Sequence, residues 1–505
     1  MSKTVILIMT SVVVYLAVVL AIGFWSSKKN KNVDDFYLGG RKLGPLVTAM
    51  SAEASDMSSW LLMGLPGLAY LCGIAEASWT AIGLIIGTYL NWLIVAKRLR
   101  KYSSKINAIT VPDFFSNRFK DDKNILACIS AIVIIIFFVP YTASGFAACG
   151  KLFETLFGAD YHTAMIISAV VIVGYTCLGG FLAASTTDLI QSIVMSIALV
   201  VVLGFGVYTA GGFEQVAENA RAISNYISMV STTDGNGGAV EFGAMKIIST
   251  LAWGLGYFGM PHILLRFMAI EDSKKIKTSR RIATVWVVIS MAVAIFIGVV
   301  GLAMSNVEPS MVLKDSETVV ISISNLLAKN GVIAALAAGV IIAGILASTM
   351  STADSQLLTA ASAVSQNIVV STFKKKLTAK QNMIWARGTL LVISIIAVFF
   401  AWDKDSSVFK IVSFAWAGFG GAFGPLMLFA LFWKRTTKWG ALAGMVSGGV
   451  SVIAWHYLQG GIFEIYELLP AFIISSLFIV VVSLLTKAPE QEVIDTFEEV
   501  KAMKD

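Results

Sequence analysis

The sequence predicts an all-α polytopic membrane protein of about thirteen transmembrane helices, with a five-plus-five inverted-repeat core that contains discontinuous helices. Three observations predict this fold: the composition, the recurring apolar runs and the placement of the basic residues. Of the 505 residues, 57 % are hydrophobic and only 14 % are charged, and the mean hydropathy is +0.80. So few polar side chains cannot cover a water-soluble globule of this size, so lipid must surround most of the chain.

Runs of about 20 apolar residues, long enough to cross the hydrocarbon core as a helix, recur along the chain. The first run lacks the basic start and the small-residue cleavage site of a secretion signal, so we predict that it is a span. The predicted spans are 4–26, 44–70, 75–96, 125–153, 160–180, 187–209, 242–265, 282–305, 332–362, 384–402, 409–433, 437–458 and 462–486.

The basic residues give the predicted orientation, because cytoplasmic loops carry an excess of Lys and Arg. Of the 38 Lys and Arg residues, 30 lie in six segments: 27–43, 96–124, 266–282, 372–387, 434–438 and 487–505. These are every second loop, except that the very short loop at 181–186 is not basic. We therefore predict that the N-terminus is outside and the C-terminus is in the cytoplasm. The formal charge of +7 then reflects membrane topology, and no nucleic-acid partner is expected.

Two successive blocks of five spans begin on opposite sides of the membrane, which makes them inverted relative to each other. In such repeats the binding site lies at the interface, beside interrupted helices. The predicted organisation is an additional N-terminal helix with the first cytoplasmic loop (1–43), a first repeat (44–210), an extracellular loop (211–241), a second repeat (242–433), two additional helices (434–486) and a cytoplasmic tail (487–505).

The first span of the first block contains a polar run, Ser51 to Trp60, that includes Glu53 and Asp56. An ionisable residue in mid-membrane costs about 2.5–3.5 kcal/mol, so such residues face a cavity or a partner. The small residues of the run leave room for unwound backbone, whose carbonyl groups could hold a cation. The alternative is that the two carboxylates only pair with a basic residue of the bundle.

The first span of the second block is interrupted by three glycines and Pro261, which removes a backbone donor. Trp253 and Tyr257 lie one helical turn apart and should form an aromatic wall with two polar tips. The glycines also spell GxGxxG, but that fingerprint needs a strand before it and a soluble βαβ unit around it. We therefore expect no dinucleotide and no other organic cofactor.

A third polar segment lies in the ninth span, where hydroxyl residues recur at spacings of three and four from Ser348 to Ser355. Hydroxyl and carbonyl oxygens suit hard cations, whereas no imidazole or thiolate is offered to a transition metal. Hydrogen bonds between helices are the alternative role for these residues. Asp188, at the start of the sixth span, either neutralises a cation or favours the helix N-terminus.

Six motifs occur in the order in which they occur in the sodium/solute symporter family, which this sequence resembles across nearly all of its predicted spans. Among the members of that family, the bacterial proline carriers are the most similar. The motifs are DDFYLGGRKLGP from Asp34, SAEASDMSSWLLMGLPG from Ser51, GGFLAASTTD from Gly179, WGLGYFGMPHILLRFMA from Trp253, STMSTADSQLL from Ser348 and SFAWAGFGGAFGP from Ser413.

The resemblance implies a sodium site and a solute site. Sodium would be held by the backbone carbonyls of Ala54, Met57 and Ser348 and by the hydroxyls of Ser351 and Thr352. Sodium coupling would involve Asp56 and Arg41, with Asp188 as part of a possible second cation position. The implied solute contacts are Ser58, Trp60, Gly64, Tyr141, Trp253, Tyr257 and Pro261.

The sequence departs from the proline-carrier pattern at Glu53 and Ser59, where glycine is expected, and at Ser348, where alanine is expected. The last change leaves sodium binding little affected, because only a carbonyl is needed there. Glu53, in contrast, lies beside the implied site, and neither its role nor that of Asp354 follows from the pattern.

The resemblance implies a carrier in the cytoplasmic membrane of a bacterium that imports a small solute with Na+ by alternating access. L-Proline is the first expectation for the solute, and a sugar, a carboxylate or a vitamin is the alternative. A membrane sensor that binds a solute without carrying it is a further alternative. No enzyme is expected, since the three histidines are scattered and HExxH, GxSxG and P-loop motifs are missing.

Overall fold

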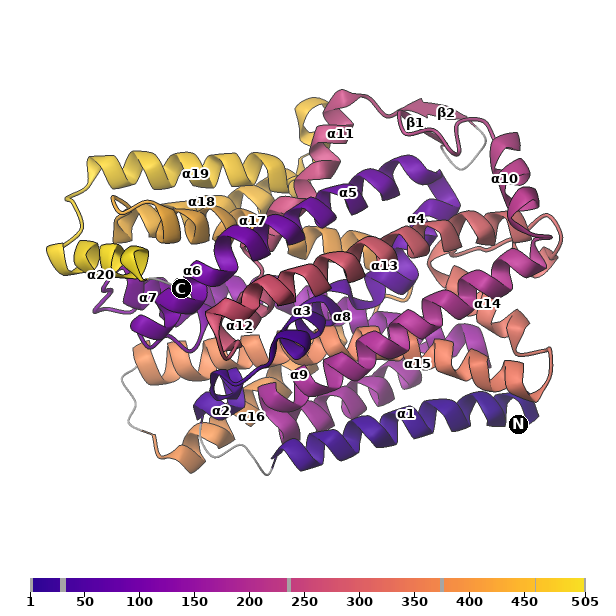
Figure 1. Cartoon of the computed structure of the whole chain (residues 1–505), viewed down its shortest axis with the longest axis horizontal. Helices are drawn as coiled ribbons and strands as arrows, with labels where there is room; N and C mark the ends of the chain where they lie inside the picture. Colours follow the sequence, from indigo (N-terminus) through magenta and orange to yellow (C-terminus); the bar gives the residue numbers. More distant parts are fainter. Residues whose placement is uncertain (1–2, 28–32, 234–237, 373–376, 459, 504–505) are drawn as a thin grey trace.

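The computed structural model describes residues 3–27, 33–233, 238–372, 377–458 and 460–503. Most long helices run side by side along the long axis of the molecule, and the two chain ends lie at opposite ends of the bundle (Figure 1). Within these ranges nine helices are long and apolar enough to cross a membrane, or ten if one bent pair is a single span. Apart from one short hairpin, the all-α prediction is confirmed.

Eight long helices each follow one predicted span. They are α1 (Lys3–Ser27), α5 (Ile74–Leu90), α8 (Ile125–Phe157), α13 (Ile276–Met304), α15 (Val332–Ser362), α16 (Ala379–Phe400), α17 (Val408–Phe432) and α19 (Leu468–Leu485). The tenth candidate is the bent pair, Ala244–Phe258 with Pro261–Ala269, which consists of α11 (Ala244–Leu251), η4 (Ala252–Phe258) and α12 (Pro261–Ala269).

Of the four remaining predicted spans, three lie in interrupted segments and one lies in a continuous helix. The region 44–70 is divided among α3 (Pro45–Ser59), the π-helical turn η2 (Trp60–Gly64) and α4 (Leu65–Cys72). The regions 160–180 and 187–209 both lie in α9 (Tyr161–Thr209), and 437–458 corresponds to α18 (Lys438–Tyr457). The count of thirteen spans therefore stays a prediction.

A single glycine divides α9. A straight helix of 49 residues would be about 74 Å long, more than twice the thickness of a hydrocarbon core of about 30 Å. At Gly180 the backbone leaves the helical region, with φ 63° and ψ −164°. A residue with a Cβ would be strained there, and the Cβ would lie 2.6 Å from the Phe36 ring. Gly180 thus allows the chain to break at the middle of α9.

Several predicted loops contain regular structure. The segment 211–241 holds α10 (Phe213–Ala222) and a hairpin of β1 (Ser231–Thr233) and β2 (Ala239–Glu241), in which Ser231 pairs with Glu241. The C-terminal tail forms α20 (Gln491–Ala502). The remaining short elements are α2 (Val33–Leu38), η1 (Gly39–Arg41), η3 (Asn91–Val95), α6 (Ala96–Lys105), α7 (Val111–Arg118), η5 (Ser273–Lys275), η6 (Pro309–Met311), η7 (Ser316–Thr318), α14 (Val319–Leu327), η8 (Ala363–Thr372) and η9 (Gly461–Glu464).

The centre of the bundle is formed by α3, α8, α9 and α15, which pack against one another, with α12 alongside α3 and α15, while η4 packs against α5 and α17. The start of α3 is joined to the end of α12, because Leu43 N donates to Ala269 O (3.2 Å) and Glu271 N donates to Leu43 O (2.9 Å). The two interrupted segments therefore share one end of the molecule, and both η2 and η4 pack against α17.

Candidate functional site

The helical geometry of α3 is interrupted at Ser58. This residue has φ 44° and ψ −171°, an arrangement that is costly for a residue with a side chain. The Ser58 hydroxyl accepts the backbone N–H of Trp60 at 3.1 Å, so a short polar side chain replaces part of the lost backbone bonding. The run from Ser51 to Ser59 consists mostly of small side chains, which permits a break in this region.

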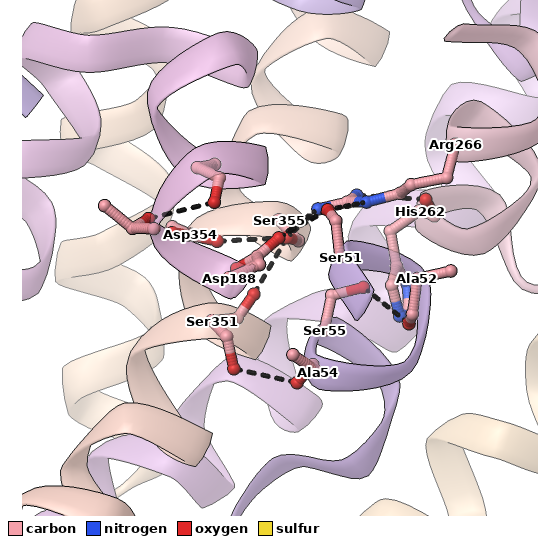
Figure 2. Close-up of polar contacts among 12 residues, drawn as sticks. Ser51, Ala52, Ala54, Ser55, Asp188, His262, Arg266, Ser351, Asp354 and Ser355 are labelled. Carbon is pink, nitrogen blue, oxygen red and sulfur yellow. Dashed lines mark hydrogen bonds and ion pairs between the residues drawn. The ribbon is translucent and has the colours of Figure 1, made fainter. Parts of the chain in front are cut away.

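The break faces α15, and a hydroxyl connects the two helices. The Ser351 hydroxyl donates to the carbonyl of Ala54 at 2.8 Å and lies 3.1 Å from the carbonyl of Ser348. The Thr352 hydroxyl also lies 3.1 Å from that carbonyl. Figure 2 shows Ser351 of α15 pointing at Ala54 of α3. Four of the five expected sodium contacts are therefore adjacent, and the fifth, Met57, follows one turn later on α3.

A small cavity, here called the aromatic hollow, lies on one side of the break and has an empty volume of about 230 Å³. The part of this space that a water-sized sphere can enter is only about 10 Å³, about one water molecule, so the lining side chains must move apart to admit a solute. The hollow is lined by Asp56, Met57, Trp60, Leu84, Tyr141, Trp253, Val412 and Trp416.

Aromatic rings dominate this hollow. The ring of Trp253 lies 5.7 Å from that of Trp60, 5.5 Å from that of Phe409 and 6.5 Å from that of Trp416. The indole N–H of Trp60 is buried and has no hydrogen-bond partner among the described residues. The hollow therefore offers flat apolar faces together with one unused donor.

The acidic edge of the hollow is held by two tyrosines. The Tyr257 hydroxyl donates to Asp56 Oδ2 at 2.5 Å, and the Tyr141 hydroxyl donates to the Asp56 carbonyl at 3.3 Å. Tyr141 also lines a second cavity of about 170 Å³, here called the hydroxyl hollow, together with Ser58, Ser59, Thr142, Ser144, Gly145, Thr349, Thr352, Ala353 and Gln356. Tyr141 thus separates the two hollows and lies close to Thr352.

Three expected solute contacts, Gly64, Tyr257 and Pro261, line neither hollow. Gly64 packs under the indole of Trp60, where a Cβ would come within 3.2 Å of that ring. Pro261 is the first residue of α12, after a non-helical Met260 with φ −72° and ψ 108°. Both residues shape the breaks, and neither lines the space beside them.

Asp188 forms a buried ion pair with Arg266. The Arg266 Nη2 lies 3.1 Å from Asp188 Oδ2, and both side chains are at most 1 % exposed. Ser51 donates to the same oxygen at 2.6 Å, and Arg266 also donates to Ser51 (3.0 Å) and Ser355 (2.5 Å), as Figure 2 shows. The position expected for a second cation therefore already faces a guanidinium group. Asp354 joins the network through Ser355 (3.0 Å).

The position of Arg266 corrects the sequence analysis, which placed residues 266–282 in a cytoplasmic loop. Arg266 is in α12 and is completely buried. In the sequence the apolar run ends at Arg266, but in the structure the helix continues to Ala269. The buried charge of Arg266 is tolerated because Asp188 and two serines compensate it.

The hydrogen-bond partners of Arg41 are not residues that line either hollow. Its guanidinium donates to the carbonyls of Met268 (2.7 Å), Ala108 (2.5 Å) and Ser103 (3.2 Å). Burial lowers the pKa of Arg41 to about 10, so the side chain stays cationic near neutral pH. Arg41 thus ties the first predicted cytoplasmic loop to the end of α12, and any part in coupling would act through that end.

The sequence analysis missed Trp416 as a lining residue, although it lies in one of the motifs. The Trp416 indole donates to the carbonyl of Trp253 at 2.7 Å. It packs directly on Gly256, where a Cβ would lie 2.0 Å from the indole nitrogen. Gly256 and Gly259 of GxGxxG therefore allow close packing against α17, whereas Gly254 packs against Gly83 and Gly87 of α5. Only the pairing of the two motifs in the fold reveals this role.

Replacing Gly256 with alanine should destabilise the protein by about 1–3 kcal/mol, because Trp416 or η4 must shift to admit the new methyl group. Thermal unfolding of the purified protein in detergent would measure this as a lower Tm. Gly204→Ala on α9 is the matched control, because its Cβ meets nothing within 4 Å. Equal Tm values for Gly256→Ala and the control would contradict the close packing.

The family model of the sodium:solute symporter family matches residues 36–448. The chain belongs to the sodium:solute symporter family. Its members are symporters, so the predictions of this family and of a transporter rather than an enzyme are confirmed. The symporter chain is 44 % identical to the high-affinity proline transporter of Bacillus subtilis, with 95 % of this chain and 98 % of that protein covered.

Other relatives and solved structures agree with this assignment. The sodium/proline symporter of Escherichia coli is 43 % identical, over 97 % of this chain and 95 % of that protein. The structure of a Na+-coupled sialic acid symporter, solved substrate-bound and outward-open, has a TM-score of 0.78 at 18 % identity. It covers 96 % of this symporter chain and 99 % of that chain. This structural likeness confirms the all-α transporter fold.

Proposed function

We propose that this protein is a sodium-coupled symporter that imports L-proline by alternating access. The observation that carries the proposal is the contact between Ser351 and Ala54 (2.8 Å), which joins the interrupted α3 to α15 directly beside the aromatic hollow. Relatives that are 43–44 % identical over nearly the whole chain are named sodium/proline symporters, which supports both the ion and the solute.

The proposed sodium site consists of five oxygens. The carbonyls of Ala54, Met57 and Ser348 and the hydroxyls of Ser351 and Thr352 come from two helices that meet at the break in α3. These are hard oxygen ligands, of the kind that hard cations prefer. When sodium is bound, it would replace the Ser351–Ala54 hydrogen bond as the link between α3 and α15.

The proposed solute site is the aromatic hollow. The ring of proline would lie against the faces of Trp60 and Trp253, and its ammonium group would be attracted by the same faces. The unused indole N–H of Trp60 is a donor for the carboxylate. A sugar would need several more unpaired polar groups than these aromatic walls provide, which is why we favour proline over the polar alternatives.

Coupling follows if each ligand orders the site that the other needs. Sodium would fix the unwound end of α3, and this end carries Asp56, Met57 and Trp60 into the wall of the hollow. Movement of one charge through 100 mV supplies about 2.3 kcal/mol for solute uptake. Asp56 and Asp188 would support the ion site through Tyr257 and Arg266, and Arg41 would act at the end of α12.

We also propose the membrane arrangement that the basic loops predict. The N-terminus would be outside and the C-terminus in the cytoplasm, in the cytoplasmic membrane of a bacterium. An odd number of spans is consistent with chain ends at opposite ends of the bundle (Figure 1). The proposed repeats, 44–210 and 242–433, each begin with one of the interrupted segments.

The test is uptake of radiolabelled proline by the purified protein in liposomes, with and without a sodium gradient. Ser351→Ala removes one ligand oxygen, and interactions with a charged partner are worth about 1.5–3 kcal/mol. We therefore expect the sodium concentration for half-maximal uptake to rise about tenfold or more. Thr359→Ala on the same helix is the control, because that hydroxyl bonds only to the carbonyl of Ser355 (2.7 Å).

Uptake that is equally fast without sodium would overturn the proposed coupling. Competition by unlabelled solutes tests the substrate, and a sugar or a dicarboxylate that displaces proline uptake more strongly than proline itself would overturn the choice of proline. Saturable binding with no uptake would instead indicate a sensor.

A further inference from the structure

Two buried carboxylates on α3 have no basic partner. Glu53 and Asp56 lie one helical turn apart and are 1 % and 6 % exposed, and their charges repel each other. Their hydrogen-bond donors are neutral: the indole of Trp92 reaches Glu53 Oε1 at 3.1 Å, and the Tyr257 hydroxyl reaches Asp56 Oδ2 at 2.5 Å. Neither donor compensates a negative charge.

The nearest arginine in the network described above is already engaged. Arg266 bonds to Asp188, Ser51, Ser355 and the carbonyl of His262. Among the hydrogen bonds and ion pairs of the described residues, none joins Glu53 or Asp56 to a Lys, Arg or His. Burying two such charges without a counter-charge is costly in a membrane protein, so each carboxylate is compensated either by a proton or by a bound cation.

The second oxygen of each carboxylate, Glu53 Oε2 and Asp56 Oδ1, is buried and has no hydrogen-bond partner among the described residues. The same is true of the Thr88 hydroxyl and the Asn91 amide oxygen on the facing helix, whose residues are 1 % and 0 % exposed. When the two carboxylates are ionised, three of these four atoms can only accept. An acceptor-rich set of oxygens suits a hard cation, because no donor remains to satisfy it.

Hydrogen bonds link these residues into one ring. The Asn91 side-chain amide donates to the carbonyl of Tyr257 at 2.9 Å, the Tyr257 hydroxyl donates to Asp56, and Thr88 lies one helical turn before Asn91. Trp92, next to Asn91, returns to Glu53. The unpartnered oxygens thus come from α3, α5 and η3, which enclose the same few side chains.

We propose that Glu53, Asp56, Thr88 and Asn91 form a second binding site for a monovalent cation, which is sodium if the proposed sodium coupling is correct. This site is separate from the one between α3 and α15, because it uses side chains that face α5 instead of backbone carbonyls that face α15. It also gives Glu53 a role, where the proline-carrier pattern has glycine.

A second co-transported cation would increase the solute gradient that the protein can sustain. Each additional charge adds about 2.3 kcal/mol per 100 mV, which corresponds to about 50-fold in concentration. The site would therefore favour uptake of a scarce solute, and each solute would enter with one additional sodium ion.

The experiment is equilibrium binding of radioactive 22Na+ to the purified full-length protein in detergent. We expect two sodium ions per protein for the wild type and one for Glu53→Gln, which keeps the shape of the side chain but removes its charge. Ser351→Ala should weaken the other ion, so that the two variants affect different steps of the binding curve. Glu53→Gln should also reduce the sodium-to-proline ratio in reversal-potential measurements on liposomes from two to one.

Thr88→Val and Thr80→Val form a matched pair on α5. Both threonines are buried with unpartnered hydroxyls, but only Thr88 belongs to the ring. Thr88→Val should weaken the second ion, and Thr80→Val should leave both ions bound. One sodium per wild-type protein with intact sodium-dependent uptake would overturn this inference and leave the proposed function standing, whereas uptake without any sodium dependence would overturn the proposed function itself.

Discussion

Arg266→Met should destabilise the folded protein by about 3–5 kcal/mol, because it leaves the Asp188 carboxylate buried and unpaired. The pair is separated by 3.1 Å and is at most 1 % exposed, so no water can compensate the remaining charge. Ser51 and Ser355 also lose a donor. Unfolding of the purified protein in mixed micelles of increasing denaturing detergent would measure the loss.

The partner substitution separates charge from packing. Asp188→Asn in the Arg266→Met background removes the unpaired charge, so the double variant should be more stable than Arg266→Met alone. Lys275→Met is the control, because its pair with Glu271 (2.6 Å) has side chains 48 % and 40 % exposed and should contribute under about 1 kcal/mol. Equal losses of unfolding free energy from Arg266→Met and Lys275→Met would contradict a larger stabilising contribution from the buried pair.

The long helices were predictable because lipid imposes a simple rule on sequence: about 20 apolar residues satisfy their own backbone. α8, α13 and α15 follow this rule and lie where the sequence places them. The region 44–70 was recognised as one interrupted span, but the position of the break at Ser58 was not predictable. Several small residues from Ser51 to Ser59 would permit it, and the packing against α15 selects one.

The buried charges mark the limit of prediction from one sequence. Arg266 follows an apolar run and is followed by more basic residues, so its sequence neighbourhood is the same as that of a residue at the membrane surface. Its partner Asp188 is 78 positions away, and only the folded chain brings them together. The same holds for Trp416 and Gly256, whose contact joins two motifs that the sequence shows separately.

Trp253→Ala should weaken proline binding by about 30-fold or more, because a central buried tryptophan in a small site typically contributes about 2 kcal/mol or more. Its indole lies next to those of Trp60 (5.7 Å) and Trp416 (6.5 Å) and closes the aromatic hollow. The backbone contact to Trp416 uses the carbonyl of residue 253 and remains available in the variant, so the loss reflects the ring.

Binding of radiolabelled proline at saturating sodium measures this effect on the dissociation constant directly. Trp253→Phe keeps an aromatic face and should recover most of the affinity. Trp433→Ala is the control, because that ring contacts Phe429 (5.6 Å) and lines neither hollow. If Trp253→Ala bound proline as tightly as Trp433→Ala, the solute would have to bind elsewhere, and the hydroxyl hollow beside Thr352 would be the next place to test.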